Sequence, residues 1–120
     1  MSKNLSIDYV ELPAADFAAV EAFYSAVFGW SFESYGPEYH AFKDGNLDGG
    51  FYKSSAISNA DNGAALVIFY ATDLEAVQDA VVAAGGLIVK PIFSFPGGRR
   101  FQFNDPHGNE LAVWTDQGLS

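Results

Sequence analysis

The chain has 120 residues, of which 49% are apolar and 16% aromatic, enough for one packed domain and too many for a disordered chain. Fifteen acidic against six basic residues give a net charge of −9, which disfavours nucleic acid and anionic membranes as partners. The absence of cysteine excludes disulfides, thiolate nucleophiles and cysteine-based zinc sites. The two histidines, His40 and His107, leave little for a histidine-rich metal centre.

Residues 1–8 lack the basic segment and apolar core of a secretory signal. The longest apolar stretch, residues 64–71, is far shorter than a membrane-spanning helix requires. We therefore expect a cytoplasmic, soluble protein.

The sequence contains one internal repeat, because residues 16–20 (DFAAV) match residues 73–77 (DLEAV) at an offset of 57. After each copy, apolar side chains recur at steps of three and four residues, which predicts a helix with one buried face. Asp16 and Asp73 are the expected N-caps. Gly29 and Gly85 follow the predicted helices, and Gly85 suits the left-handed conformation there.

Short strands are predicted around both helices. Residues 5–12 and 65–71 precede the helices, and three strand-like segments follow each one, at 30–35, 39–42 and 47–53 and at 87–91, 99–104 and 110–115. Residues 54–63 are small and polar, as expected of a linker. The prediction is a single α+β domain made of two βαβββ modules, about residues 1–58 and 64–120.

Two motifs carry a family resemblance. Residues 16–30 read DFAAVEAFYSAVFGW and residues 103–110 read FNDPHGNE, and together at this separation they resemble the glyoxalase/bleomycin-resistance/dioxygenase (vicinal oxygen chelate) superfamily. The resemblance implies a U-shaped, partly open mixed sheet around a cleft, helices outside, and a homodimer. The motif residues themselves predict structure, since the aromatic side chains are expected in the core and the others in a turn: Phe23, Tyr24, Phe28, Trp30, Asp105, Pro106, Gly108 and Asn109.

Catalytic members of this superfamily hold a divalent metal with His and Glu from four strand positions. The resemblance places these positions at Tyr9, near residues 49–51, at Val67 and at Ala112. Valine and alanine have no donor atom, and tyrosine is a poor ligand until it is deprotonated. We therefore expect no metal or other cofactor, and a metal would need other ligands. His107 is expected in a solvated turn.

Strand alternation predicts which side chains line the cleft. On the first strand Tyr9 and Glu11 share a face, while Val10 and Leu12 pack under the helices. A four-residue turn at 105–108 would pair the flanking strands so that their cleft-facing residues coincide. The predicted cleft comprises Tyr9, Glu11, His40, Phe69, Phe101, Glu110, Ala112 and Trp114, and a register slip of one residue would reverse part of it.

Glu11 is the candidate catalytic residue. A carboxylate among apolar strand neighbours is costly unless it is paired or faces water. It could act as a general base or attract a cationic ligand. The alternatives are a salt bridge or a hydrogen bond at a dimer interface. Arg99 and Arg100 could meet Glu11 or Glu110, or lie at a solvated strand end.

Four functions are compatible with these residues. The favoured one is a metal-independent, glyoxalase-like protein that binds a small organic molecule, and that as an enzyme would be an isomerase or lyase related to lactoylglutathione lyase. The second is a binder resembling the bleomycin-resistance branch, which sequesters a flat cationic ligand. The third is a metal-dependent enzyme of the lactoylglutathione lyase or dioxygenase type. The fourth is a dimeric domain that makes protein contacts only.

Overall fold

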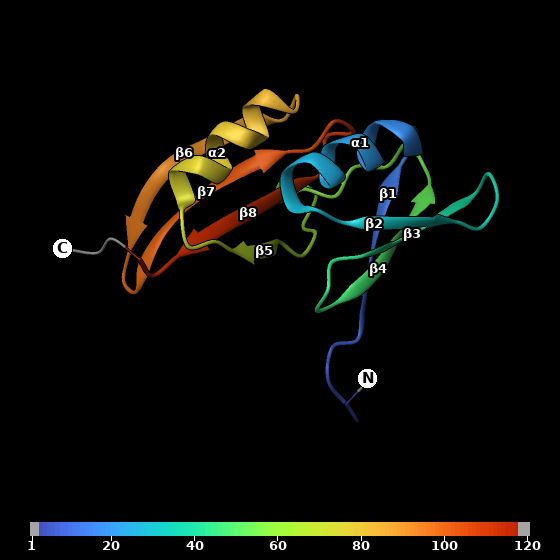
Figure 1. Cartoon of the computed structure of the whole chain (residues 1–120), viewed down its shortest axis with the longest axis horizontal. Helices are drawn as coiled ribbons and strands as arrows, with labels where there is room; N and C mark the ends of the chain where they lie inside the picture. The colour runs from blue at the N-terminus through green and yellow to red at the C-terminus, as the bar shows by residue number, and fades with distance from the viewer. Residues whose placement is uncertain (1–2, 118–120) are drawn as a thin grey trace.

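A computed structural model describes residues 3–117 and shows one βαβββ unit repeated in succession (Figure 1). The N-terminal module consists of β1 (Tyr9–Ala14), α1 (Phe17–Phe28), β2 (Ser31–Ser34), β3 (Tyr39–Lys43) and β4 (Asp48–Lys53). The C-terminal module consists of β5 (Val67–Tyr70), α2 (Leu74–Ala83), β6 (Leu87–Phe95), β7 (Gly98–Asn104) and β8 (Glu110–Thr115). The predicted α+β fold of two such modules is confirmed.

Each module forms its own four-stranded mixed sheet, in the orders β1-β4-β3-β2 and β5-β8-β7-β6. In both sheets the first strand pairs parallel with the last strand, and the other pairs are antiparallel. The helices lie on one side of the two sheets (Figure 1). We call the sheet face under the helices the helix face and the other the open face.

The predicted helix caps are confirmed. The Asp16 carboxylate accepts a hydrogen bond from the Ala19 N–H at 3.2 Å, and Asp73 accepts one in α2 at 3.1 Å. Gly29 ends α1 with a φ of 71°, and Gly85 follows α2 with a φ of 98°. Across residues 3–117, neither helix combines the length and apolar character needed to cross a membrane.

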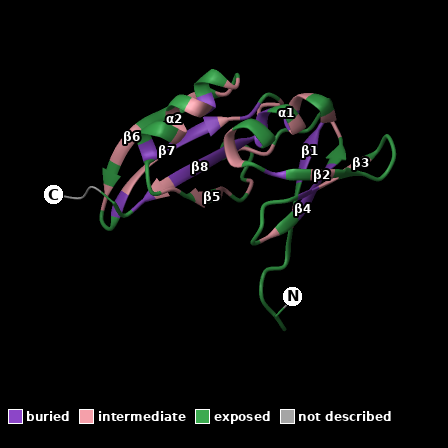
Figure 2. Cartoon of the chain, in the orientation of Figure 1, coloured by how far each residue is buried: buried purple, intermediate pink, exposed green. Residues whose placement is uncertain are grey.

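Aromatic side chains join the two modules under the helices. Phe28 of α1 stacks on Phe69 of β5 with ring centroids 4.1 Å apart, and Phe23 packs against Phe103 at 5.9 Å. The buried apolar residues of β1, β7 and β8 that form the core lie beneath the helices (Figure 2). The chain therefore has one continuous core, and the first motif supplies its centre, as predicted.

The second motif is the hydrogen-bonded joint between the modules. The buried Asp105 carboxylate accepts hydrogen bonds from three backbone N–H groups of its own turn and from the Tyr24 hydroxyl at 2.8 Å. The Asn109 amide donates to the Pro13 carbonyl at 2.8 Å. Burial raises the pKa of Asp105, although these hydrogen bonds oppose the shift. Burial also raises the pKa of Tyr24 well above its ordinary value.

His107 belongs to the same joint, and the expectation of a solvated turn residue is wrong. The side chain is partly buried, and its Nδ1 accepts a hydrogen bond from the Ala15 N–H at 3.2 Å. Its Nε2 lies 2.7 Å from the Ala56 carbonyl oxygen and donates to it. The ring thus ties the C-terminal turn to the β1–α1 junction and to the linker.

The main differences from the predicted strands concern β1, β6 and the β7–β8 turn. Strand β1 starts at Tyr9, and β6 continues past Pro91, where a shift in pairing between Lys90 and Phe93 accommodates a residue without an N–H. The β7–β8 turn takes five residues, so that Asn104 pairs with Glu110. The predicted β7–β8 register is therefore wrong by one residue.

Candidate functional site

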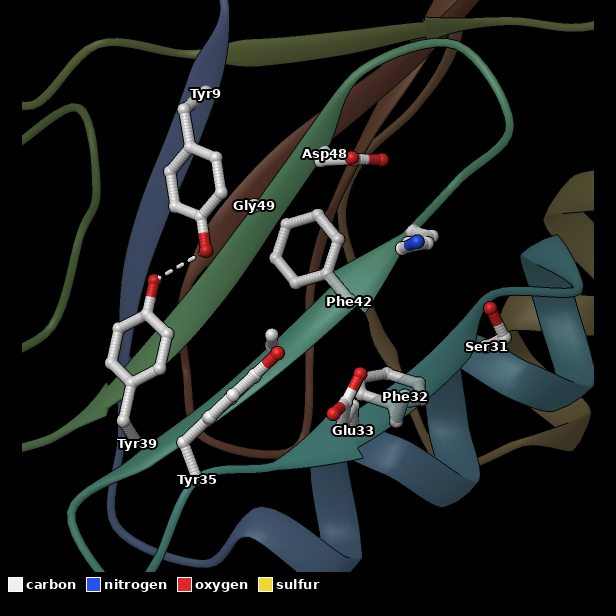
Figure 3. A pocket seen from close by; sticks show the side chains of 11 residues that line it. Tyr9, Ser31, Phe32, Glu33, Tyr35, Tyr39, Phe42, Asp48 and Gly49 are labelled. Atoms are coloured by element: carbon white, nitrogen blue, oxygen red, sulfur yellow. Dashed lines mark hydrogen bonds between the residues drawn. The ribbon is translucent and has the colours of Figure 1, made fainter.

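The open face of the N-terminal sheet contains a hollow of about 600 Å³ (Figure 3). This volume lies within the range of small-molecule sites. Strands β1, β2, β3 and β4 and the segment after β2 contribute to its lining. The polar and aromatic residues that line this N-terminal hollow are Tyr9, Ser31, Phe32, Glu33, Tyr35, Tyr39, Phe42, Lys43 and Asp48.

Small residues at the centre of the sheet leave room for the hollow above Ala41 and for the Tyr39 side chain above Gly50. In the strand register Glu11 lies opposite Gly50, Gly50 opposite Ala41, and Ala41 opposite Glu33. Carboxylates therefore flank two positions that carry no side chain or only a methyl group. A Cβ on Gly50 would lie 2.1 Å from the Tyr39 hydroxyl oxygen. Glycine at this position allows Tyr39 to lean across the strand toward β1.

Tyr39 connects β3 to β1 through a chain of hydrogen bonds. Its hydroxyl lies 2.7 Å from the Tyr9 hydroxyl (Figure 3). The same hydroxyl donates to Glu11 Oε2 at 2.9 Å. Because the Tyr39 proton is committed to Glu11, Tyr9 must donate to Tyr39. Within residues 3–117, nothing donates a hydrogen bond to Glu11 Oε1. Both hydroxyl protons are thus used internally, and the network offers acceptor atoms to a ligand.

The surroundings of Tyr39 and Tyr35 favour the protonated form of both side chains. Desolvation, the hydrogen bond with Tyr9 and the hydrogen bond to Glu11, in that order, raise the pKa of Tyr39 far above its ordinary value. The Glu33 carboxylate raises the pKa of Tyr35. A tyrosinate nucleophile or metal ligand is therefore disfavoured here, and the negative charge of the hollow resides on its carboxylates.

The first-strand prediction is confirmed, but the position predicted for His40 is wrong. Tyr9 and Glu11 share the open face, and Leu12 is buried in the core. His40 lies on the helix face, where its ring stacks on Phe17 at 5.5 Å and its Nε2 lies 2.6 Å from the carboxylate of Glu21. Its side chain contacts α1 and does not reach the hollow.

Comparison with known proteins identifies the fold family. The family model described as the glyoxalase/bleomycin resistance protein/dioxygenase superfamily matches residues 6–113. The chain belongs to this superfamily. A search of curated proteins gave no match.

Solved structures of the glyoxalase superfamily share the architecture. A glyoxalase-related enzyme from Fulvimarina pelagi has a TM-score of 0.76 at 18% identity, covering 92% of this chain and 88% of that one. A family enzyme from Burkholderia phytofirmans has a TM-score of 0.75 at 19% identity, covering 91% and 97%. Lactoylglutathione lyase from Agrobacterium tumefaciens has a TM-score of 0.72 at 24% identity, covering 98% and 100%. At these identities the likeness shows the fold alone.

The residues at the superfamily's metal positions do not fit a divalent ion. Tyr9 and Ala112 lie on open faces, and Gly50 is covered by the Tyr39 side chain. Val67, assigned to the third position, packs against the core under the helices, and Ile68 beside it faces the open side. Neither Val67 nor Ile68 has a donor atom. Over residues 3–117 no three His, Asp or Glu side chains gather closely enough to bind a metal.

The C-terminal part of the predicted cleft is divided between the two faces of its sheet. Phe69 on β5 and Phe101 on β7 both pair with Val113 of β8, one from each side. Paired residues share a face, so Phe69 and Phe101 lie with Val113 on the helix face. Their placement in the cleft was wrong, and the incorrect turn length is the cause for Phe101. Trp114 lies on the open face, as predicted.

Glu110 also lies on the open face but is closed to ligands. Its carboxylate accepts hydrogen bonds from the Gln102 amide at 2.7 Å and from the Ala60 N–H of the linker at 3.0 Å, and the residue is buried. Arg99 and Arg100, the predicted partners of Glu110, do not pair with its carboxylate. Arg99 pairs with Glu75 of α2, and Arg100 donates to Gln102.

Sequence reasoning missed Tyr39, Tyr35 and Gly50. The alternation of β3 contained the signal, because a buried Phe42 places His40 on the same face and Tyr39 on the other. The requirement for glycine at position 50 comes from the Tyr39 ring, a contact that only the folded sheet creates.

Proposed function

We propose that this protein binds a small organic molecule in the N-terminal hollow, without a metal ion, and that Glu11 is the anchoring acceptor. The observation that carries the proposal is the Tyr9–Tyr39–Glu11 hydrogen-bond chain beside a hollow of about 600 Å³. Both hydroxyl protons point along the chain, so the site fits a ligand that brings its own N–H or O–H donors.

The charge of the hollow favours a cationic ligand. Its carboxylates belong to Glu33 and Asp48 in the lining and to Glu11 behind Tyr39, and the ammonium in the lining is that of Lys43. Tyrosine rings at its edges offer faces to a cation. These residues therefore best support the binding of a flat, cationic molecule that is not chemically changed.

Benzamidinium, a flat cation with four N–H donors, is a suitable probe, and benzamide is its neutral control. We expect saturable benzamidinium binding by calorimetry, weaker benzamide binding, and a loss of about tenfold or more in Glu11→Gln, as for a charge-assisted hydrogen bond. Asp79→Asn on α2 removes the same charge outside the hollow and should leave binding unchanged. Equal benzamidinium affinity in wild type and Glu11→Gln would contradict the role of Glu11.

Proton transfer is the second candidate function, because Glu11 Oε1 accepts no hydrogen bond from residues 3–117. Such a carboxylate can take a proton from a substrate carbon and return it to a neighbouring carbon, an isomerisation that balances without a co-reactant. The ketone 2-indanone tests this possibility, since general-base catalysis would speed its deuterium uptake from D₂O in wild type and not in Glu11→Gln. Equal rates with both proteins would leave binding as the function.

A homodimer is the further part of this proposal. It is supported by the open edges of the two sheets, among them β1 and β5, each of which pairs with one neighbour within the described residues. Sedimentation velocity at micromolar concentration should show a species of twice the chain mass. A monomer at all concentrations would contradict it.

A further inference from the structure

The open face of the C-terminal sheet carries a second, smaller hollow of about 320 Å³. Ile68, Phe95, Arg100 and Trp114 line it, and three of these four side chains are apolar. The Phe95 and Trp114 rings lie 6.4 Å apart, and the Arg100 guanidinium also lies over the Phe93 ring at 5.4 Å. We call this the C-terminal hollow.

Arg100 has no carboxylate partner within residues 3–117, although the chain has fifteen acidic residues. Its Nη2 donates to the neutral Gln102 side chain at 2.9 Å, and its Nε is buried without an acceptor. A guanidinium that is partly withdrawn from water, with one neutral acceptor among aromatic rings, gains most from an added anion. The preceding residue, Arg99, shows the contrast, because it pairs with Glu75 on the helix face.

The repeat explains why Arg100 is unpaired. Tyr39 is opposite Tyr52 in the N-terminal sheet, and Arg100 is opposite Trp114 at the equivalent place in the C-terminal sheet. The acceptor for Tyr39 is Glu11, which lies opposite Gly50 on the first strand.

At the position equivalent to Glu11, the C-terminal module has Ile68, which lies opposite Ala112. The second module therefore has the donor of this pair and lacks the acceptor, and the missing group is a carboxylate.

We propose that the C-terminal hollow binds the carboxylate of a small apolar acid, with Arg100 on the carboxylate and Ile68, Phe95 and Trp114 around the hydrocarbon part. A fork of guanidinium N–H groups matches a carboxylate in two-point geometry. The volume suits a single aromatic ring. This inference does not rest on the function proposed for the N-terminal hollow.

Phenylacetate is the probe, and phenylacetamide is its neutral control of the same shape. Trp114 lines the hollow and Trp30 is buried in the core, so tryptophan fluorescence reports binding at this site. We expect saturable binding of phenylacetate in the millimolar range or tighter, and at least about tenfold weaker binding of phenylacetamide. Equal affinities, or no saturation by phenylacetate, would overturn the proposal.

Three variants locate the effect. Arg100→Gln should abolish the preference for phenylacetate over phenylacetamide, and Arg99→Gln, which removes the same charge from the adjacent residue on the helix face, should preserve it. Ile68→Glu keeps Arg100 and supplies the missing carboxylate at an exposed position, so it should suppress phenylacetate binding even if Arg100→Gln fails to fold. Phenylacetate binding that is unchanged in Ile68→Glu, or lost equally in Arg99→Gln, would refute the assignment.

Discussion

The two modules place different side chains at one equivalent position, and this gives their open faces opposite character. In the N-terminal sheet Tyr39 reaches across β4 to a carboxylate on the first strand, at Glu11. In the C-terminal sheet Arg100 occupies the same place, and the first strand offers Ile68. One face therefore gathers acceptors and the other has an unpaired donor.

This difference shows how a duplicated fold can present two different sets of polar groups without a change in strand order. Strand order and pairing directions are the same in both sheets. The identity of one side chain on the first strand decides whether the donor at the neighbouring position is satisfied internally. Chemistry in this chain is thus set by side chains on the open faces, whereas the two sequence motifs build the core and the joint.

The largest expected effect concerns the hydrogen-bonded joint around Asp105 that connects the two modules. Tyr24→Phe leaves the buried Asp105 carboxylate with one donor fewer, and this should lower the free energy of unfolding by about 1.5–3 kcal/mol in urea denaturation. Tyr52→Phe, at an exposed position, is the control. If each face is determined within its module, the folded variant still binds benzamidinium and phenylacetate. If the folded variant bound neither benzamidinium nor phenylacetate, the packing of the two modules against each other would determine both open faces.

The second prediction concerns Gly50 and Ala112, which occupy equivalent positions in the two sheets. An alanine at position 50 would make the N-terminal sheet resemble the C-terminal sheet at this point. Gly50→Ala forces Tyr39 away from Glu11 and should cost about 1–3 kcal/mol by overpacking. Ala112→Gly, the reverse change, should cost about 1 kcal/mol through strand flexibility and a small lost contact. Urea midpoints measure both costs, and benzamidinium binding should weaken only in the first. An unaffected Gly50→Ala variant would show that Tyr39 can move without consequence.

The fold could be read from the sequence because its signals are local and repeated. The steps of three and four residues and the caps at Asp16 and Asp73 predict the helices from neighbours in the chain alone. The motif residues then locate the core and the turn. Even the contrast between Tyr9 and Val10 follows from simple alternation along one strand.

The site required information that no single segment contains. Hydrogen bonds to Asp105 hold a turn of five residues, one more than predicted. The extra residue shifts the strand register and places Phe101 on the helix face instead of in the predicted cleft. His40 was misplaced for a related reason, since the face of a short strand is decided by the partner that covers it, here α1. The Tyr39–Glu11 contact joins residues 28 positions apart across a strand between them.

A pH titration sharpens the comparison further, because only the N-terminal module has a tyrosine at this position. The neutral form of Tyr39 is favoured in the fold, so its stabilising contribution is complete below the ordinary tyrosine pKa of about 10 and is lost as pH rises through the raised pKa. Glu11→Gln should lower the pKa of Tyr39 only partway, since desolvation and the Tyr9 hydrogen bond persist. Tyrosinate absorbance in an alkaline titration measures this, with Asp79→Asn as the control. Unchanged tyrosine titration in Glu11→Gln would contradict the contact.

The smallest effect is expected at the Arg99–Glu75 pair, which distinguishes the two neighbouring arginines. The hydrogen bond from Arg99 lowers the pKa of Glu75 below its ordinary value of 4.5, so the stabilisation is present above that value and is lost as pH falls through the lowered pKa. The Glu75 carboxylate faces solvent, which screens the pair, and the change in urea midpoint in Arg99→Gln should be the smallest of this series. The difference from wild type should vanish in strong acid, where Glu75 is protonated. A difference that persists there would mean that Arg99 stabilises the sheet through packing of its side chain, and it would weaken the use of Arg99→Gln as a pure charge control for Arg100.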